Sequence, residues 1–196
     1  MKLFTKLLMV MVSMAMLVMP MTAQNEPPPG FPIIEDFSDM SEWTLNGDAI
    51  HDSGNGWLQL TDIITKQEGL AVLNTIFSSS YGIVVEFEFY AGGGTGADGI
   101  AFFLVEGNTD PVTPGAFGAA LGYACGPFES PPGIPNAIIG IGFDECGNFP
   151  TDLVGHGGIP LTSATGDVVA MRGAGNGTVG YDYLTHVETL DLGGID

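Results

Sequence analysis

The residues best suited to chemistry are carboxylates and an amide at the ends of apolar runs. Asp98 precedes the apolar run 99–105, while Asp144 ends the run 137–144 and Asn148 follows it. Oxygen ligands at the spacing of Asp144 and Asn148 can converge on one hard cation, such as Ca²⁺, if the backbone between them bends and lends a carbonyl. Asp and Asn are also common where a strand leaves for a loop, so an ordinary strand end is the alternative interpretation.

Sequence patterns for other common chemistries are weaker. Glu86 and Glu88 alternate on one strand face, but no aspartate stands between them as a jelly-roll glycoside hydrolase would need, and a solvated sheet face is the better interpretation. The glycine-rich run 92–96 lacks the lysine of a phosphate-binding loop. No Cys–His pattern is typical of a zinc site, and the histidines have no catalytic-triad signature. These patterns favour a binding protein over an enzyme.

The chain is strongly acidic, with 23 acidic against 4 basic residues and a formal net charge of −19. Such a surface repels phosphate backbones, so nucleic acid is excluded as a partner, and anionic membrane surfaces are disfavoured for the same reason. Neutral ligands such as sugars, and cations such as Ca²⁺, are compatible with it. The chain is also 45% hydrophobic and 10% aromatic, which is enough apolar side chain for a folded core.

The first 23 residues have the features of a secretory signal peptide. Lys2 and Lys6 precede an apolar run over 7–19, and Ala23 supplies the small residue of a cleavage site. An uncleaved membrane anchor is the alternative, but the run is short for a span and no basic residues follow it. We therefore expect a secreted or cell-surface protein, with no membrane insertion after cleavage, a Pro-rich linker over 24–33 and one domain over 34–196.

The rest of the chain has the pattern of β-structure. Many short strands with glycine and proline turn signals between them predict an all-β fold, either a sandwich or a barrel. Trp43 and Trp57 lie in alternating segments and are expected in the core. The last residues, 192–196, resemble a loop more than an edge strand, so the domain is expected to be incomplete at its C-terminus. The clearest predicted strands are 57–61, 82–90, 99–105, 137–144 and 167–172.

Three segments, in their order and spacing, resemble the L-type (legume-type) lectin family. They are GADGIAFFL at 96–104, the Gly-rich segment PGAFGAALGY at 114–123, and IGIGFDECGNF at 139–149. The resemblance extends from about residue 34 to about residue 183. It implies an antiparallel, concanavalin A-like jelly-roll β-sandwich that binds glycans or polysaccharide, uses calcium and has no catalytic activity.

The resemblance also implies roles for individual residues. Asp98 would follow a cis peptide bond from Ala97 and would accept hydrogen bonds from two sugar hydroxyls, because hydrogen bonds to a carboxylate are strong. Gly118 would offer its backbone N–H, since glycine allows a ligand to come close to the main chain. Asn148 would donate its side-chain amide to the sugar. The implied calcium ligands are Asp144, the main-chain carbonyl of Cys146, Asn148 and Asp152, with Asp167 as an alternative to Asp152.

This sequence departs from the family pattern at two positions near the implied site. Gly142 replaces the glutamate that holds a second metal in some members, so a transition-metal site is not expected. Cys146 replaces the aromatic residue whose ring packs on the sugar, so either Phe149 or Tyr123 takes over that contact or sugar binding is weak. Export permits a disulfide, and a bridge between Cys125 and Cys146 would join two walls of the site; two separate buried thiols are the alternative.

The function expected from the sequence is calcium-dependent binding of neutral glycans by a secreted lectin domain. One alternative is a structural or adhesive surface module of the same fold that has lost sugar binding. A glycoside hydrolase on a related jelly-roll fold is the other, because fold alone does not decide between binding and catalysis. The sequence also leaves open a homodimer, since dimers of such domains use sheet edges.

Overall fold

The computed structural model describes residues 30–80, 82–93, 97–110, 113–127 and 131–189. The chain divides into two units, Met1–Ile34 and Glu35–Asp196, and the second contains the described strands. The predicted signal peptide, most of the predicted linker and the C-terminal residues 192–196 lie outside the described residues. Among the described residues, no helix has the length and apolar character that a membrane span requires.

The described strands pair only in antiparallel fashion, which confirms the predicted all-β class. The strand pairing does not by itself establish a jelly-roll sandwich. Short 3₁₀ helices, η1 (Gly118–Ala120) and η3 (Leu161–Ser163), interrupt the connections. The strands are β1 (Trp43–Gly47), β2 (Ile50–Asp52), β3 (Trp57–Gln59), β4 (Gly69–Leu73), β5 (Gly99–Val105), β6 (Ala137–Asp144), β7 (Val168–Arg172), β8 (Gly175–Asn176), β9 (Val179–Gly180) and β10 (Tyr183–Glu188).

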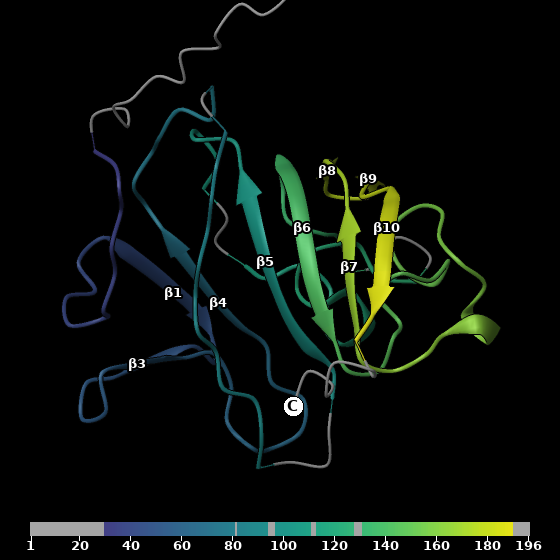
Figure 1. Ribbon diagram of the computed structural model, residues 1–196, viewed down its shortest axis with the longest axis horizontal. Helices are drawn as coiled ribbons and strands as arrows, with labels where there is room; N and C mark the ends of the chain where they lie inside the picture. Colours follow the sequence, from purple (N-terminus) through teal and green to yellow (C-terminus); the bar gives the residue numbers. More distant parts are fainter. Residues whose placement is uncertain (1–29, 81, 94–96, 111–112, 128–130, 190–196) are drawn as a thin grey trace, which may run out of the picture. The chain divides into compact units, whose positions relative to one another are not determined.

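The largest sheet is built around β6 (Figure 1). Strand β5 pairs along one side of β6, β7 pairs along the other, and β10 pairs with β7. β1 pairs with β4, and β2 pairs with β3, in separate two-stranded sheets. Because β6 has a neighbour on each side, its sequence is apolar at nearly every position, as expected of a central strand.

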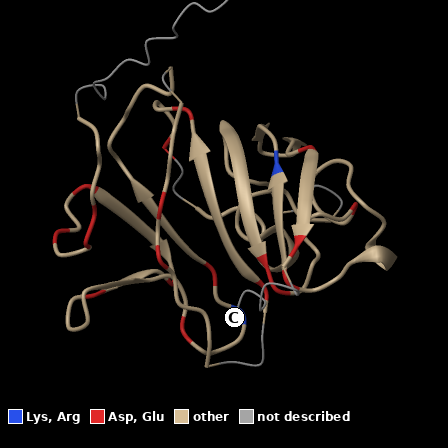
Figure 2. Ribbon diagram, in the orientation of Figure 1, with Lys and Arg blue, Asp and Glu red and all other residues tan. Residues whose placement is uncertain are grey.

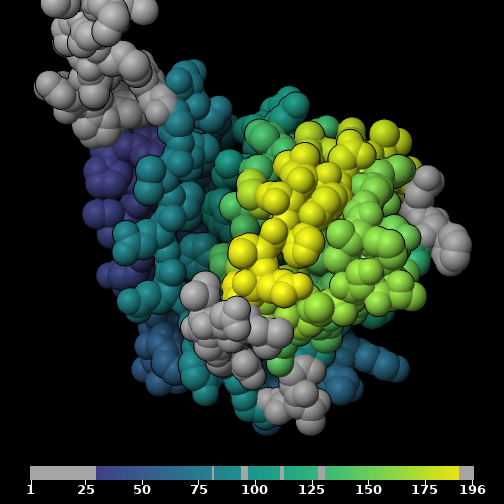
Figure 3. Space-filling view, turned by 45° about the vertical axis from the view of Figure 1, so that its right-hand side comes forward, coloured from purple at the N-terminus to yellow at the C-terminus, as the bar shows by residue number. Residues whose placement is uncertain are grey.

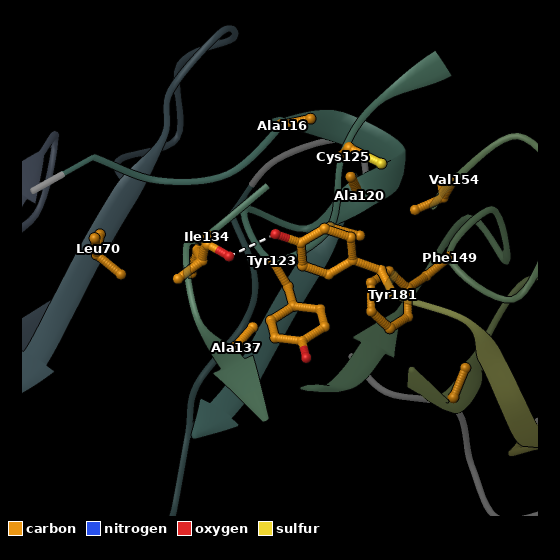
Figure 4. Close-up of a cluster of buried hydrophobic side chains, with 12 residues drawn as sticks. Leu70, Ala116, Ala120, Tyr123, Cys125, Ile134, Ala137, Phe149, Val154 and Tyr181 are labelled. Atoms are coloured by element: carbon orange, nitrogen blue, oxygen red, sulfur yellow. Dashed lines mark hydrogen bonds between the residues drawn. The ribbon is translucent and has the colours of Figure 1, made fainter. Parts of the chain in front are cut away.

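One face of the large sheet is covered largely by the connections, and Leu70 of β4 belongs to the same core cluster. Figure 4 shows this core, in which Tyr123, Phe149 and Tyr181 are fully buried. A Cβ at Gly140 would lie 2.5 Å from the ring of Tyr123, and one at Gly142 would lie 2.5 Å from the ring of Phe149. The rings therefore lie directly on the backbone of β6, which explains why glycine alternates along the covered face of that strand.

Aromatic rings from the segment 82–90 pack on the opposite face of the sheet. Phe87 stacks on Phe102 with ring centroids 6.0 Å apart, and Phe89 lies 5.5 Å from Phe143. The prediction of a strand over 82–90 is wrong for this structure, because the segment belongs to no described ladder. Among the described contacts, packed aromatic rings hold the segment to the sheet.

Several apolar side chains lie on the surface. Trp57 is 58% exposed, which corrects its predicted place in the core, because it lies in the isolated hairpin of β2 and β3. Leu184 and Val187 of β10 are also exposed. Figure 3 shows the β10 region, in yellow, on the near face of the space-filling view, beside light-green residues that precede β7.

Candidate functional site

Asp98 and Asp144 meet at one end of the large sheet. Gly99 at the start of β5 is paired with Asp144 at the end of β6, and the N–H of Glu145 donates to the carbonyl of Asp98 at 3.0 Å. The peptide bond between Ala97 and Asp98 is cis, as the family resemblance implied. Figure 2 shows red acidic positions at this end of the sheet, at the tips of β6 and β10. Two segments about 45 residues apart in sequence thus place their carboxylates side by side.

Gly118 reaches the same place from the Gly-rich connection. This connection folds back on itself, since the N–H of Gly115 donates to the carbonyl of Gly122 at 2.7 Å. Gly118 has a φ of +68°, a conformation that favours glycine. A Cβ at Gly118 would lie 3.7 Å from Oδ2 of Asp98. The structure therefore brings together the predicted sugar-binding aspartate and the predicted backbone donor.

The carboxylate of Asp144 holds the loop that follows β6. Its Oδ1 accepts the N–H of Cys146 at 3.0 Å, and its Oδ2 accepts the N–H of Phe149 at 2.6 Å. Burial raises the pKa of Asp144, the backbone hydrogen bonds act against that shift, and the negative charge of Asp98 raises the pKa further. A second negative group next to a buried carboxylate makes this end of the sheet favourable for a cation.

The loop over 145–148 is packed tightly against the segment before β7. Gly147 has a φ of +74°, and a Cβ there would collide with the carbonyl of Thr165. The N–H of Asp167 donates to the carbonyl of Glu145 at 3.1 Å. Asn148 is half-buried, and its main-chain carbonyl accepts the N–H of Thr151 at 3.0 Å. Asn148 is thus held in the same loop as Asp144, as the predicted site requires.

Asp152 stands apart from this arrangement. It is exposed, and its Oδ1 accepts the N–H of Leu161 at 3.1 Å, which turns the carboxylate toward the η3 connection. Asp167, the alternative, is the residue whose backbone contacts the Asp144 loop. Within the described ranges, no group of three or more His, Cys, Asp or Glu side chains is arranged to hold a metal ion. A cation here would depend on amide, main-chain and water oxygens beside the carboxylate of Asp144.

Phe149 and Tyr123 are not available to pack on a sugar, which corrects that prediction. Both side chains are fully buried. The hydroxyl of Tyr123 donates to the carbonyl of Gly173 at 2.8 Å, and the ring of Phe149 lies beneath the guanidinium of Arg172, 5.6 Å from Cζ to the ring centroid. Each ring fills the space above a glycine of β6, so both rings are part of the packed core and not of the site surface.

The predicted disulfide is also absent, since the structure does not join Cys125 to Cys146. Cys125 is buried in the core, where its carbonyl accepts the N–H of Gly155. Cys146 is an exposed residue in the loop after β6. Partial burial of its thiol and the nearby charges of Asp98, Asp144 and Glu145 raise its pKa. The two thiols thus lie in different parts of the structure, Cys125 inside the core and Cys146 at the end of the sheet.

Sequence reasoning overlooked Arg172, which organises the loop next to the site. Its side chain is fully buried and donates to the carbonyls of Phe149, Thr151 and Tyr181 at 2.7, 2.6 and 2.8 Å. Burial lowers its pKa to about 10, so the guanidinium is still charged at neutral pH. The sequence did carry a sign of this buried arginine. In β7, Val168, Ala170 and Arg172 alternate toward the covered face, so Arg172 is a charged residue at a position where an apolar side chain is usual.

No protein-family model matches this chain, and no curated protein is similar to it.

Proposed function

We propose that this chain is a secreted, non-catalytic carbohydrate-binding protein of the L-type lectin class, with a concanavalin A-like jelly-roll β-sandwich. The observation that carries the proposal is the convergence of Asp98, Gly118 and the loop of Asp144 and Asn148 at one sheet end. These residues come from three separate segments. The family resemblance implies a sugar-binding role for Asp98, Gly118 and Asn148 and a calcium-binding role for Asp144 and Asn148. The strong net acidity supports a neutral ligand.

In the proposed site, the half-buried carboxylate of Asp98 accepts hydrogen bonds from two hydroxyls of a sugar. The backbone N–H of Gly118 donates to the same sugar, since no side chain at this position blocks the approach. The side-chain amide of Asn148 donates a further bond. A pattern of one charged acceptor and two neutral donors suits adjacent hydroxyls on one sugar ring.

Calcium is part of the proposal, and the oxygen atoms near Asp144 are suitable ligands for such a hard cation. Asp144, Asn148 and the carbonyl of Cys146 would hold it, with Asp167 a better-placed fourth residue than Asp152. The negative charges of Asp98 and Asp144 are electrostatically coupled, so a divalent cation would relieve their repulsion. Calcium bound there would fix the loop that presents Asn148 and would strengthen the orientation of Asp98.

A structural or adhesive module without sugar binding is the second candidate, because the site has no stacking ring on the Asp144 loop. Cys146 occupies the position where the family has that ring, and Phe149 is buried beneath Arg172. A site of hydrogen bonds alone would bind sugars weakly, since each exchanges with water. This candidate keeps the same fold and predicts no measurable glycan affinity.

A glycan array tests the proposal directly. The mature chain is applied with Ca²⁺ and again after chelation, beside Asp98→Asn, which removes the charge of the central acceptor, and Glu86→Gln, which removes an exposed carboxylate outside the site. We expect wild type and Glu86→Gln to bind the same glycans, and Asp98→Asn and the chelated protein to lose them. Binding that survives in Asp98→Asn would refute the site, and a folded, Ca²⁺-treated wild type that binds no glycan would favour the structural module.

A further inference from the structure

Phe117 is an exposed aromatic ring beside the candidate site. Its side chain is 60% exposed, whereas the rings of Tyr123, Phe149 and Tyr181 are fully buried. Phe117 immediately precedes Gly118, the glycine whose Cβ would lie 3.7 Å from Oδ2 of Asp98. Its position one residue from the proposed sugar site makes this exposed ring a candidate contact surface, because an aromatic ring offers a large apolar face for packing.

The backbone around Phe117 is held firmly. Ala116, the preceding residue, is buried, and its N–H donates to the carbonyl of Ala124 at 3.1 Å. Gly118, the following residue, begins η1, and its carbonyl accepts the N–H of Leu121 at 2.8 Å. A ring carried by an anchored backbone loses little conformational entropy when a ligand covers it, which favours binding.

Phe117 also lines a depression of about 290 Å³ together with Lys66 and Glu68. Lys66 and Glu68 come from the connection that leads into β4, so the depression lies between that connection and the Gly-rich one. Its size is near the lower end of small-ligand sites and suits one sugar ring rather than a large ligand. Asp98 does not line it, which separates this depression from the contacts proposed at Asp98.

The described side chains that line the depression suit the surface of a sugar. One face of a sugar ring presents C–H groups that pack on an aromatic ring, while its hydroxyls point outward around the edge. Glu68 can accept and Lys66 can donate hydrogen bonds to such hydroxyls. Lys66 is the single exposed basic side chain in the described part of the chain, since Arg172 is buried, and the charge of Glu68 in the same depression offsets it. The lining therefore suits an uncharged sugar.

We propose that Phe117, Lys66 and Glu68 form a second subsite, which binds the neighbouring sugar unit of an oligosaccharide whose first unit is held at Asp98 and Gly118. This inference rests on the proposed lectin function. It makes the ligand an oligosaccharide chain rather than a single sugar. It also supplies a stacking ring from the Gly-rich connection, on a site whose other aromatic neighbours are buried in the core.

Calorimetric titration with single sugars and with their linear oligomers tests the subsite. The probes are glucose, galactose, mannose and N-acetylglucosamine, followed by oligomers of two to five units of whichever binds. We expect wild type to bind the oligomer at least tenfold more tightly than the single sugar. Phe117→Ala should lose about fivefold to tenfold of the oligomer affinity and keep the affinity for the single sugar within twofold, whereas Phe117→Tyr should restore the oligomer affinity. Trp57→Ala removes a ring of similar exposure outside the depression and should change neither affinity.

Phe117→Trp adds a direct readout, since a sugar packed on the indole should shift its fluorescence to shorter wavelength with the oligomer but not with the single sugar. Phe117→Ala with the full oligomer preference would overturn the subsite, and so would equal losses of single-sugar and oligomer affinity. Failure of the lectin function itself has a different result: wild type would bind none of the sugars, or Asp98→Asn would bind them as wild type does.

Discussion

Replacing Arg172 is the most informative perturbation of the protein, because one buried side chain connects the sheet to the loop beside the site. The guanidinium donates to the carbonyls of Phe149 and Thr151, in the chain that follows Asn148, and to the carbonyl of Tyr181 before β10. Arg172→Met keeps most of the side-chain volume but removes all of these donors. Arg172→Lys keeps the charge but offers one nitrogen in place of the planar fork.

The magnitude follows from the three short hydrogen bonds, at 2.7, 2.6 and 2.8 Å, all from a fully buried side chain. Each buried acceptor left without a donor costs about 1–3 kcal/mol, which gives about 3–9 kcal/mol as an upper range. Removing the charge relieves its desolvation, the same effect that lowers the pKa of Arg172. We therefore expect Arg172→Met to lose about 3–5 kcal/mol and Arg172→Lys about 2–3 kcal/mol of unfolding free energy.

Urea unfolding followed by far-UV circular dichroism at neutral pH measures this loss, with Lys66→Met as the control. Lys66 is an exposed basic residue, so its replacement should change stability by less than about 0.5 kcal/mol. Amide hydrogen exchange over 149–157 should rise in Arg172→Lys more than elsewhere, since its donors leave that loop. A stability of Arg172→Met within about 1 kcal/mol of wild type, at an unchanged denaturant slope, would refute the view that the guanidinium holds the loop.

Three further predictions follow from packing and burial. Gly142→Ala should lose about 1–3 kcal/mol of stability in the same urea assay, because its Cβ would lie 2.5 Å from a core ring, whereas Gly173→Ala meets only ordinary contacts and should match wild type. Iodoacetamide should modify Cys146 in the native protein, more slowly at neutral pH than an ordinary exposed thiol because its pKa is raised, and Cys125 only after unfolding; protection of both thiols that a reductant reverses would indicate a disulfide instead. Burial raises the pKa of Tyr181 to about 12, so the phenolate absorbance that Tyr181→Phe removes should lie near pH 12 in the native protein, and the stability that Tyr181 contributes is full below pH 10 and lost as the pH rises through 12; a difference between wild type and Tyr181→Phe that is centred near pH 10 in the folded state would contradict its burial.

The sequence pattern predicted two strands of the large sheet closely. The bounds of β5 and β6 agree with the predicted segments 99–105 and 137–144, because both strands are apolar along nearly their whole length and polar residues flank them. The segment 82–90 has an equally good strand pattern, yet no described strand pairs with it. Alternation shows that a segment can present an apolar side, but hydrogen-bond partners come from elsewhere in the chain.

The candidate site shows the same difference between what the local sequence indicates and what contacts between distant segments decide. The family resemblance, which depends on residue types in their order and spacing, was enough to select Asp98, Gly118 and Asp144 as candidates. Only the structure showed that Gly118 has a positive φ and that the carboxylate of Asp144 accepts hydrogen bonds from its own loop. Only tertiary packing decided where the ring of Phe149 lies. Gly142 has no side chain, and the ring of Phe149 fills the space above it. The ring is therefore buried in the core, which is favourable, instead of being exposed to a ligand. Sequence thus determined which groups can do chemistry, and the fold decided which of them solvent can reach, since burial depends on contacts between segments far apart in the chain.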